Sequence, residues 1–317
     1  MIEPTSSERP ASGLAQSDPL GNGRLLRLAT YASVSTATLL ILVKLIAWLA
    51  TGSVSVLASL VDSIMDVGAS LVNLLAVHWS LKPADAEHRF GHGKAQPLAA
   101  LGQSAFIAGS ALFVGLEAVN RLIHPRPVAD AGIGLFILGF AMVATLALLV
   151  FQHSVIRRTG STAIRADALH YATDLATNGA TLLALGLAWF GWHGADPILG
   201  FGIAAFVLLS AVRIGHDAVQ LLLDRELPQA DRDEITALAK AGPEVRGIHG
   251  LRTRRSGQLL IIQLHLELDD QLPLSEAHRI TLEAEQRIRA RYPESDIIVH
   301  QDPASLGDEH HGTSHSQ

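Results

Sequence analysis

The chain has 317 residues, of which 49% are hydrophobic, 17% are charged and none is cysteine, and its formal net charge is −6. Because soluble domains average about 25% charged residues, this balance predicts a membrane protein that also carries a soluble part. The negative charge and the lack of Lys or Arg runs argue against nucleic-acid binding, and the absence of cysteine excludes disulfides and thiolate metal sites.

Residues 1–23 contain no hydrophobic region, so we expect no cleavable signal peptide there and a disordered cytoplasmic tail. Six apolar segments long enough to cross a bilayer follow. They run over about 25–50, 54–79, 96–122, 131–156, 163–190 and 197–222. Together they predict an all-α six-helix transmembrane bundle over residues 24–223.

The basic residues of the connecting loops are distributed unequally between the two sides of this bundle. One side would carry Arg9, Arg24, Arg27, Lys82, Arg89, Lys94, Arg157, Arg158 and Arg165, and the other only Arg121 and Arg126. By the positive-inside rule, nine basic residues against two place both termini in the cytoplasm. An even number of spans agrees with that orientation.

Residues 224–303 have the composition of an ordinary globular domain. Their pattern predicts a helix near 230–241, strands near 246–255 and 259–268, a helix at 274–291 and a strand at 296–301. An αββαβ order in about 75 residues fits a small α+β domain with its helices on one face of the sheet. Residues 304–317 include His310, His311 and His315, and we expect a disordered His-bearing tail.

Two pairs of ligand-type residues, Asp62 with Asp66 and His170 with Asp174, lie inside the second and fifth apolar segments. Ionisable side chains in such segments are costly and mark functional sites by default. A spacing of four puts both members of a pair on one helix face, with a rise of roughly 6 Å between them. Three carboxylates and one imidazole suit a small divalent cation, and the alternative is a seam of interhelical hydrogen bonds.

The loop between the second and third segments carries Asp85, His88 and His92 within eight residues, with Gly91 and Gly93 beside them. These residue types suit a metal site in a tight loop, whereas the alternative is a solvated loop whose histidines are only polar. Gly93 and Lys94 do not form a nucleotide-binding loop, because His88 stands where that motif requires glycine.

Five further candidate ligands fall on separate elements of the soluble domain, namely His249, His265, His278, His300 and Asp302. Each alone is more typical of an ordinary polar side chain. Four histidines in a domain of this size leave a metal site open as an interpretation. Asn73 and Asn178, inside the second and fifth segments, are interpreted as interhelical hydrogen-bonding residues.

The motifs LVDSIMDVGASL, HRFGHGKAQPLAALGQS, RADALHYATDLATNGA, LLLDRELP and DIIVHQDP resemble the cation diffusion facilitator family, in particular its bacterial ferrous-iron and zinc efflux pumps. The resemblance covers about residues 25–303. It implies six transmembrane helices, a metallochaperone-like cytoplasmic domain over 224–303 used for metal binding and dimerisation, a homodimer and a bacterial inner-membrane location.

The resemblance also assigns roles to individual residues. It implies a transport site at Asp62, Asp66, His170 and Asp174, and a loop site at Asp85, His88 and His92. It implies cytoplasmic sites at His249, His265, His278, His300 and Asp302, with Gln301 a further contributor. It implies that Lys94 and Asp224 form a charged pair tying the membrane part to the soluble part.

We therefore expect a secondary transporter, and not an enzyme, that lies in membrane lipid and exports a divalent cation by proton antiport. The ligand types favour Zn²⁺ as substrate and as a structural or regulatory ion, with Fe²⁺ or Cd²⁺ as alternatives. No H-E-x-x-H motif supports a metalloprotease, and no nucleotide-binding signature supports an ATP-driven pump. The alternative is a membrane-anchored metal sensor that binds metal without moving it.

Overall fold

The computed structural model describes residues 19–51, 54–123, 132–189 and 195–306. These residues form two compact units, one over Asn22–Leu222 and one that contains the described residues from Leu223 onward. The predicted tails at 1–23 and 304–317 lie mostly outside the described residues. Where they are described they differ from the prediction, since the first helix already begins at Pro19 and a 3₁₀ turn covers Ala304–Leu306.

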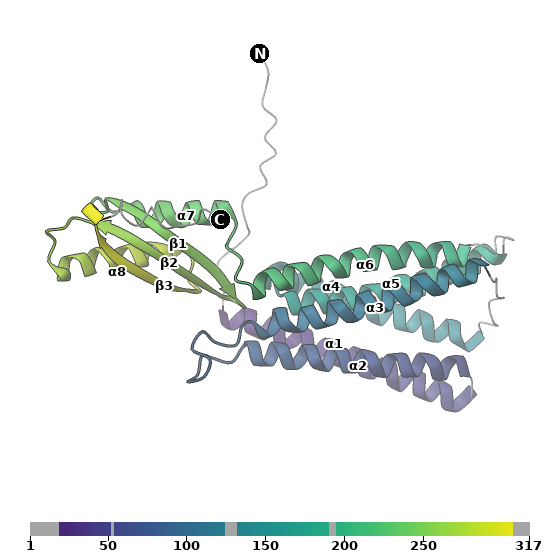
Figure 1. Ribbon diagram of the computed structural model, residues 1–317. Coiled ribbons are helices and arrows are strands. Elements are labelled where there is room, and N and C mark those ends of the chain that lie inside the picture. The colour runs from purple at the N-terminus through teal and green to yellow at the C-terminus, as the bar shows by residue number, and fades with distance from the viewer. Residues whose placement is uncertain (1–18, 52–53, 124–131, 190–194, 307–317) are drawn as a thin grey trace, which may run out of the picture. The chain divides into compact units, whose positions relative to one another are not determined.

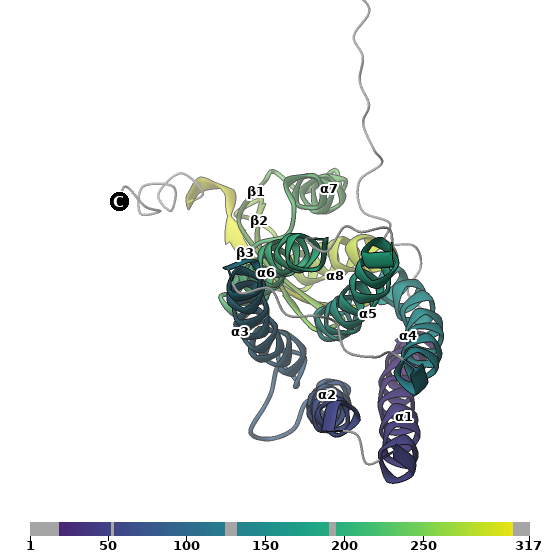
Figure 2. The same cartoon turned by 90° about the vertical axis from the view of Figure 1, so that its right-hand side faces the viewer.

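Six long helices make up the first unit (Figures 1 and 2). They are α1 (Pro19–Thr51), α2 (Val54–Ser80), α3 (Ala95–Ile123), α4 (Gly132–Thr159), α5 (Thr162–Trp189) and α6 (Ala195–Leu222). Their order and bounds match the predicted segments to within a few residues, apart from the earlier start of α1.

Among the described residues, four segments are long and apolar enough to cross a membrane: Gly21–Ala50, Ala95–Asn120, Leu138–Thr159 and Ile198–Leu222. They lie in α1, α3, α4 and α6. The helices α2 and α5 are of comparable length, at 27 and 28 residues, but carry the candidate ligands. Large apolar side chains such as Leu49, Phe113 and Val143 are about 70% exposed, as lipid-facing residues are.

The helices α3 and α6 lie side by side because small residues occupy their contact (Figures 1 and 2). A Cβ atom built on Gly115 would lie 3.6 Å from that of Ala204, and one on Gly200 would lie 3.6 Å from that of Ala118. Without a hydrophobic force between helices in lipid, such close backbone approach is a main source of helix association.

The second unit is a three-stranded sheet with two helices (Figure 1). Its elements are α7 (Gln229–Lys240), β1 (Gly247–Ser256), β2 (Leu259–Leu268), α8 (Leu274–Arg291) and β3 (Ser295–Pro303). The strand order is β1-β2-β3, with β1 antiparallel and β3 parallel to the central β2. The predicted αββαβ order is confirmed, with boundaries correct to within two residues.

The register of the sheet brings three histidines into one row. His249 on β1 lies opposite His265 on β2, and His265 lies opposite His300 on β3. A shift in register follows between His249 and Arg252, where Gly250 has a φ of +62°. The sequence positions of the histidines, 16 and 35 residues apart, become neighbouring only through this register.

The core of this unit lies between the sheet and its helices. It contains Leu260, Ile262, Leu264 and Leu266 of β2, Ile235 and Ala239 of α7, and Ile280, Ala284 and Ile288 of α8. The alternation along β2 follows the period of two that a strand imposes, so one face of the strand supplies most of these residues.

Leu264 tests how much this core contributes to the stability of the second unit. Its side chain is 1% exposed in the central strand, so Leu264→Ala is expected to cost about 2–5 kcal/mol through lost transfer energy and the cavity left behind. Faster hydrogen exchange of the β2 amides in the full-length protein would report that loss. The exposed Leu274→Ala is the matched control and should leave exchange in β2 unchanged.

Candidate metal sites

Three of the four intramembrane candidates come together between α2 and α5. His170 Nε2 lies 3.0 Å from Asp66 Oδ1 and 3.9 Å from Asp174 Oδ2. One ligand atom from each of the three residues lies within 4.8 Å of the other two, so a single small cation could contact all of them. Asp62 lies one turn before Asp66 on α2, and its side chain is outside the described part of the structure.

A buried hydroxyl cluster fixes the helices that carry these ligands. Ser70 Oγ on α2 lies 2.9 Å from the Tyr171 hydroxyl on α5 and 3.0 Å from Ser33 Oγ on α1. The Tyr171 hydroxyl also donates to the backbone oxygen of Ser33, at 3.3 Å. Since Tyr171 follows His170 directly, these bonds hold the imidazole-bearing turn of α5 against α1 and α2.

Lys44 on α1 brings a cationic group to α2, the helix that carries Asp62 and Asp66. Its Nζ donates to Ser63 Oγ at 2.6 Å and to the backbone oxygen of Ser59 at 3.1 Å. Ser63 lies between the two aspartates of α2. Sequence reasoning missed this contact because Lys44 lies on α1 and its partners lie on the next helix, so the contact depends on how the two helices pack.

The loop candidates also lie close together. Asp85 Oδ1 accepts the backbone N–H groups of His88 and Glu87, at 2.7 and 3.0 Å. His88 Nδ1 and His92 Nε2 each lie 3.4 Å from an Asp85 carboxylate oxygen, and the two rings are 4.5 Å apart. Gly91, with a φ of +75°, permits the turn between them. The hydrogen bond from the His88 backbone is the main cause that lowers the pKa of Asp85, so a ligand oxygen is available in its charged form.

In the second unit, the row of histidines surrounds one carboxylate. His265 Nδ1 and His249 Nε2 lie 2.8 and 3.1 Å from Asp302 Oδ2, and His300 Nδ1 lies 2.7 Å from Oδ1. Glu267 Oε1 lies 2.8 Å from His249 Nδ1. Burial acts to raise the pKa of Asp302, but the His265 hydrogen bond and the three imidazoles outweigh it and lower that pKa.

Glu267 is a member of this cluster that sequence reasoning missed. Residues two apart on a strand share a face, so the position of Glu267 relative to His265 could have indicated it. The cluster also requires glycine nearby. A Cβ atom on Gly250 would lie 2.9 Å from His265 Cδ2, so any other residue there would displace the ring.

Two candidates of the second unit lie outside this cluster. His278 is exposed on α8. Gln301 uses its side-chain nitrogen to donate to Thr281 Oγ1, at 2.9 Å. Their implied roles in the cytoplasmic metal sites stay predictions.

The predicted charged pair involves both units. Lys94 Nζ donates to the backbone oxygen of Leu222 at 3.1 Å within the first unit. Asp224 Oδ2 accepts from Arg254 Nη1 at 3.0 Å within the second, and Asp224 has a φ of 59°. The pairing of Lys94 with Asp224 stays a prediction.

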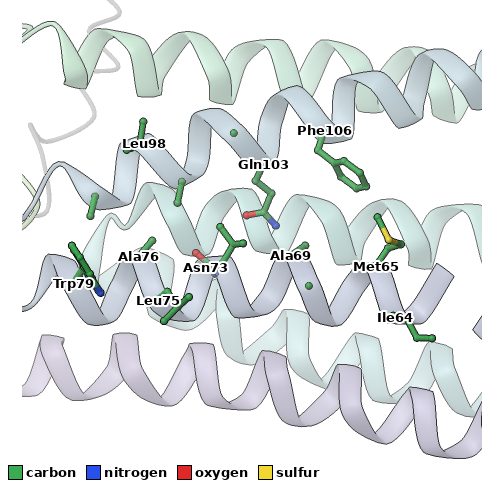
Figure 3. Close-up of a pocket in the computed structure, with 15 residues that line it drawn as sticks. Ile64, Met65, Ala69, Asn73, Leu75, Ala76, Trp79, Leu98, Gln103 and Phe106 are labelled. Atoms are coloured by element: carbon green, nitrogen blue, oxygen red, sulfur yellow. The ribbon is translucent and has the colours of Figure 1, made fainter. Parts of the chain in front are cut away.

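A groove with a cavity of about 760 Å³ runs between α2 and α3 (Figure 3). Its lining is mostly apolar, but Asn73 and Gln103 also line it. Asn73 is 1% exposed, and neither its Nδ2 nor its Oδ1 has a hydrogen-bond partner within the described residues. The interpretation of Asn73 as an interhelical hydrogen-bonding residue therefore differs from the structure of the described residues.

Comparison with known families gives two matches that together cover most of the chain. Residues 30–223 match the cation efflux transmembrane domain, and residues 227–304 match the cytoplasmic domain of cation efflux proteins. The cation-efflux pumps FieF of Klebsiella pneumoniae and of Escherichia coli K12 are each 53% identical over 284 residues, which cover 90% of this chain and 95% of theirs. Among solved structures, one from work on the mode of action of a putative zinc transporter, CzrB, matches with 28% identity over 24% of this chain and 96% of the other, at a TM-score of 0.24.

Proposed function

The chain belongs to the cation efflux family, also called cation diffusion facilitators, and we propose that it moves Zn²⁺ out of the cytoplasm in exchange for protons. It is thus an integral membrane transporter of divalent cations and not an enzyme. The choice of Zn²⁺, the coupling to protons and the residues involved are the proposal.

The observation that carries the proposal is the 3.0 Å contact between His170 Nε2 and Asp66 Oδ1. An ionised Asp66 accepts this hydrogen bond from the imidazole. A cation bound by the same two atoms requires Nε2 without a hydrogen, and a net proton is released when the ring starts as the imidazolium, since a neutral ring would only move its hydrogen to Nδ1. Cation and proton then compete for one pair of atoms, which is the minimum that antiport requires.

The chemistry of the ligands supports Zn²⁺, with Cd²⁺ and Fe²⁺ as weaker candidates. His170 supplies nitrogen, Asp66 and Asp174 supply oxygen, and Asp62 is proposed to complete a tetrahedral set. The chain has no cysteine and only three methionines, which disfavours Cu⁺. Zinc bound at the histidine cluster of the cytoplasmic domain would have a structural or regulatory role and stabilise a homodimer.

Transport by alternating access places loading and release on opposite sides of the membrane. Cytoplasmic Zn²⁺ enters the site between α2 and α5 and displaces protons, the bundle rocks to face outward, and external protons drive release. The excess of basic residues on one side supports cytoplasmic termini, and the bacterial relatives support an inner-membrane location.

Reconstitution in vesicles with an internal pH dye and a zinc dye tests the proposal. Added Zn²⁺ should enter the vesicles while protons move the opposite way, and an imposed proton gradient should accelerate zinc movement. Zinc binding without any flux would instead identify a membrane-anchored sensor. Zinc flux with no proton movement would leave an exporter but refute antiport.

A further inference from the structure

Asp167 is a buried carboxyl group that none of the proposed metal sites uses. It lies on α5 three residues before His170, and its side chain is 0% exposed. An ionisable residue inside a membrane helix is costly, so its presence calls for a functional explanation.

Two other helices supply hydrogen-bond donors to this carboxyl group. Gln152 Nε2 on α4 donates to Oδ2 at 2.7 Å, and Gln103 Nε2 on α3 lies 3.4 Å from Oδ1. Both donors are neutral, and within the described residues Asp167 forms no ion pair with Lys or Arg. The amide donors stabilise the ionised carboxylate, whereas burial away from water favours the protonated acid.

The position of Asp167 links it to the transport site. Residues three apart on a helix share a face, so Asp167 lies one turn from His170. His170 and Tyr171 are the titratable groups that interact with Asp167. Asp66 lies one step further, since it contacts His170. A divalent cation held by Asp66, His170 and Asp174 would attract negative charge at Asp167 through a medium of low dielectric constant.

We propose that Asp167 is a proton-carrying residue of this transporter, distinct from the cation ligands. When the cation binds, the O–H bond of Asp167 breaks, the proton passes to water, and Gln103 and Gln152 hold the carboxylate. When the cation leaves, the carboxylate takes a proton back. This inference rests on the proposed antiport and adds a second proton-binding group to it.

The groove between α2 and α3 adjoins one of the donors to Asp167. Gln103 both lines the groove and contacts Asp167, and Asn73 lies across the groove on α2 (Figure 3). Buried amide groups without a protein partner are ordinarily satisfied by water. A water molecule bound at Asn73 would therefore lie in the same groove as Gln103.

Proton release on zinc binding tests the proposal without requiring transport. Zn²⁺ is added to the full-length protein in weakly buffered detergent with a pH dye, and zinc affinity is measured in parallel. Asp167→Asn should bind zinc within about threefold of the original affinity but release about one proton fewer per protein. Asp217→Asn, which removes a carboxylate paired with Arg165 instead, is the matched control and should release the original number. Equal release from Asp167→Asn and the unsubstituted protein would overturn the proposal.

A second variant keeps the test decisive if Asp167→Asn does not fold. Gln152→Met removes a donor to the carboxylate and leaves Asp167 in place, so zinc-linked proton release should shift to higher pH by about one unit. If Asp167 had only a structural role, the midpoint pH of zinc-linked proton release would be the same in Gln152→Met and in the unsubstituted protein. If zinc binding to the unsubstituted protein releases no proton at all, the proposed antiport fails, and not only the role of Asp167.

Discussion

Replacing Asp174 by alanine is expected to abolish zinc-driven proton movement in reconstituted vesicles, a loss of at least about 100-fold in transport rate. Asp174 is one of the three described ligands that a single cation could contact, and it shares a helix face with His170. Loss of even an outer partner of a metal ligand typically lowers affinity 10- to 100-fold, so loss of a ligand itself should cost more.

Two comparisons make this result specific. Asp217→Ala removes a carboxylate from the same helical unit at a site outside the ligand group and should keep transport within about twofold, because partly exposed ion pairs contribute little. Asp174→Glu retains the charge but lengthens the side chain, and it should recover part of the zinc flux with altered preference between Zn²⁺ and Cd²⁺. Undiminished flux in Asp174→Ala would mean that the cation crosses elsewhere.

The helices were predictable from the sequence because each is long and mostly apolar, although α2 and α5 also carry ionisable residues. The exception is the start of α1, where Pro19 suits the first turn of a helix but the surrounding polar residues resemble a tail. The two ligand pairs were also predictable, since a spacing of four puts both residues of a pair on one face of a single helix. The contact between Asp66 on α2 and His170 on α5 was not predictable, because it depends on how two helices distant in sequence pack.

Asp167 shows a second limit of sequence reasoning. It lies in the same motif as His170 and Asp174, and the rule that selected those residues applies to it equally. What the sequence does not show is its complete burial and its contacts with Gln103 and Gln152, which lie on other helices.

The histidine cluster of the second unit depends on strand register. Each histidine is visible in the sequence, but the row across three strands requires the antiparallel pairing of β1, the parallel pairing of β3 and the shift after His249. A slip of one residue in any strand would turn its histidine to the opposite face. That dependence is why the sequence left a metal site in this domain open.

Removing the central carboxylate of the cluster is expected to eliminate the stabilisation of the cytoplasmic domain by zinc. A ligand at 100 times its dissociation constant stabilises the state that binds it by about 2.7 kcal/mol. Asp302→Ala deprives His249, His265 and His300 of the oxygen atoms they share, so adding zinc or removing it with a chelator should no longer alter hydrogen exchange in β2 and β3.

Asp270→Ala is the matched control for this experiment. Asp270 is also a carboxylate of the second unit, but it binds the backbone and hydroxyl of Ser305 and has no contact with the histidines. Its replacement should leave the zinc effect intact. If Asp302→Ala also retains the effect, zinc binds this domain elsewhere, and the exposed His278 would become the next candidate. If the effect is lost but the dimer and zinc transport persist, the cluster binds metal without regulating the membrane domain.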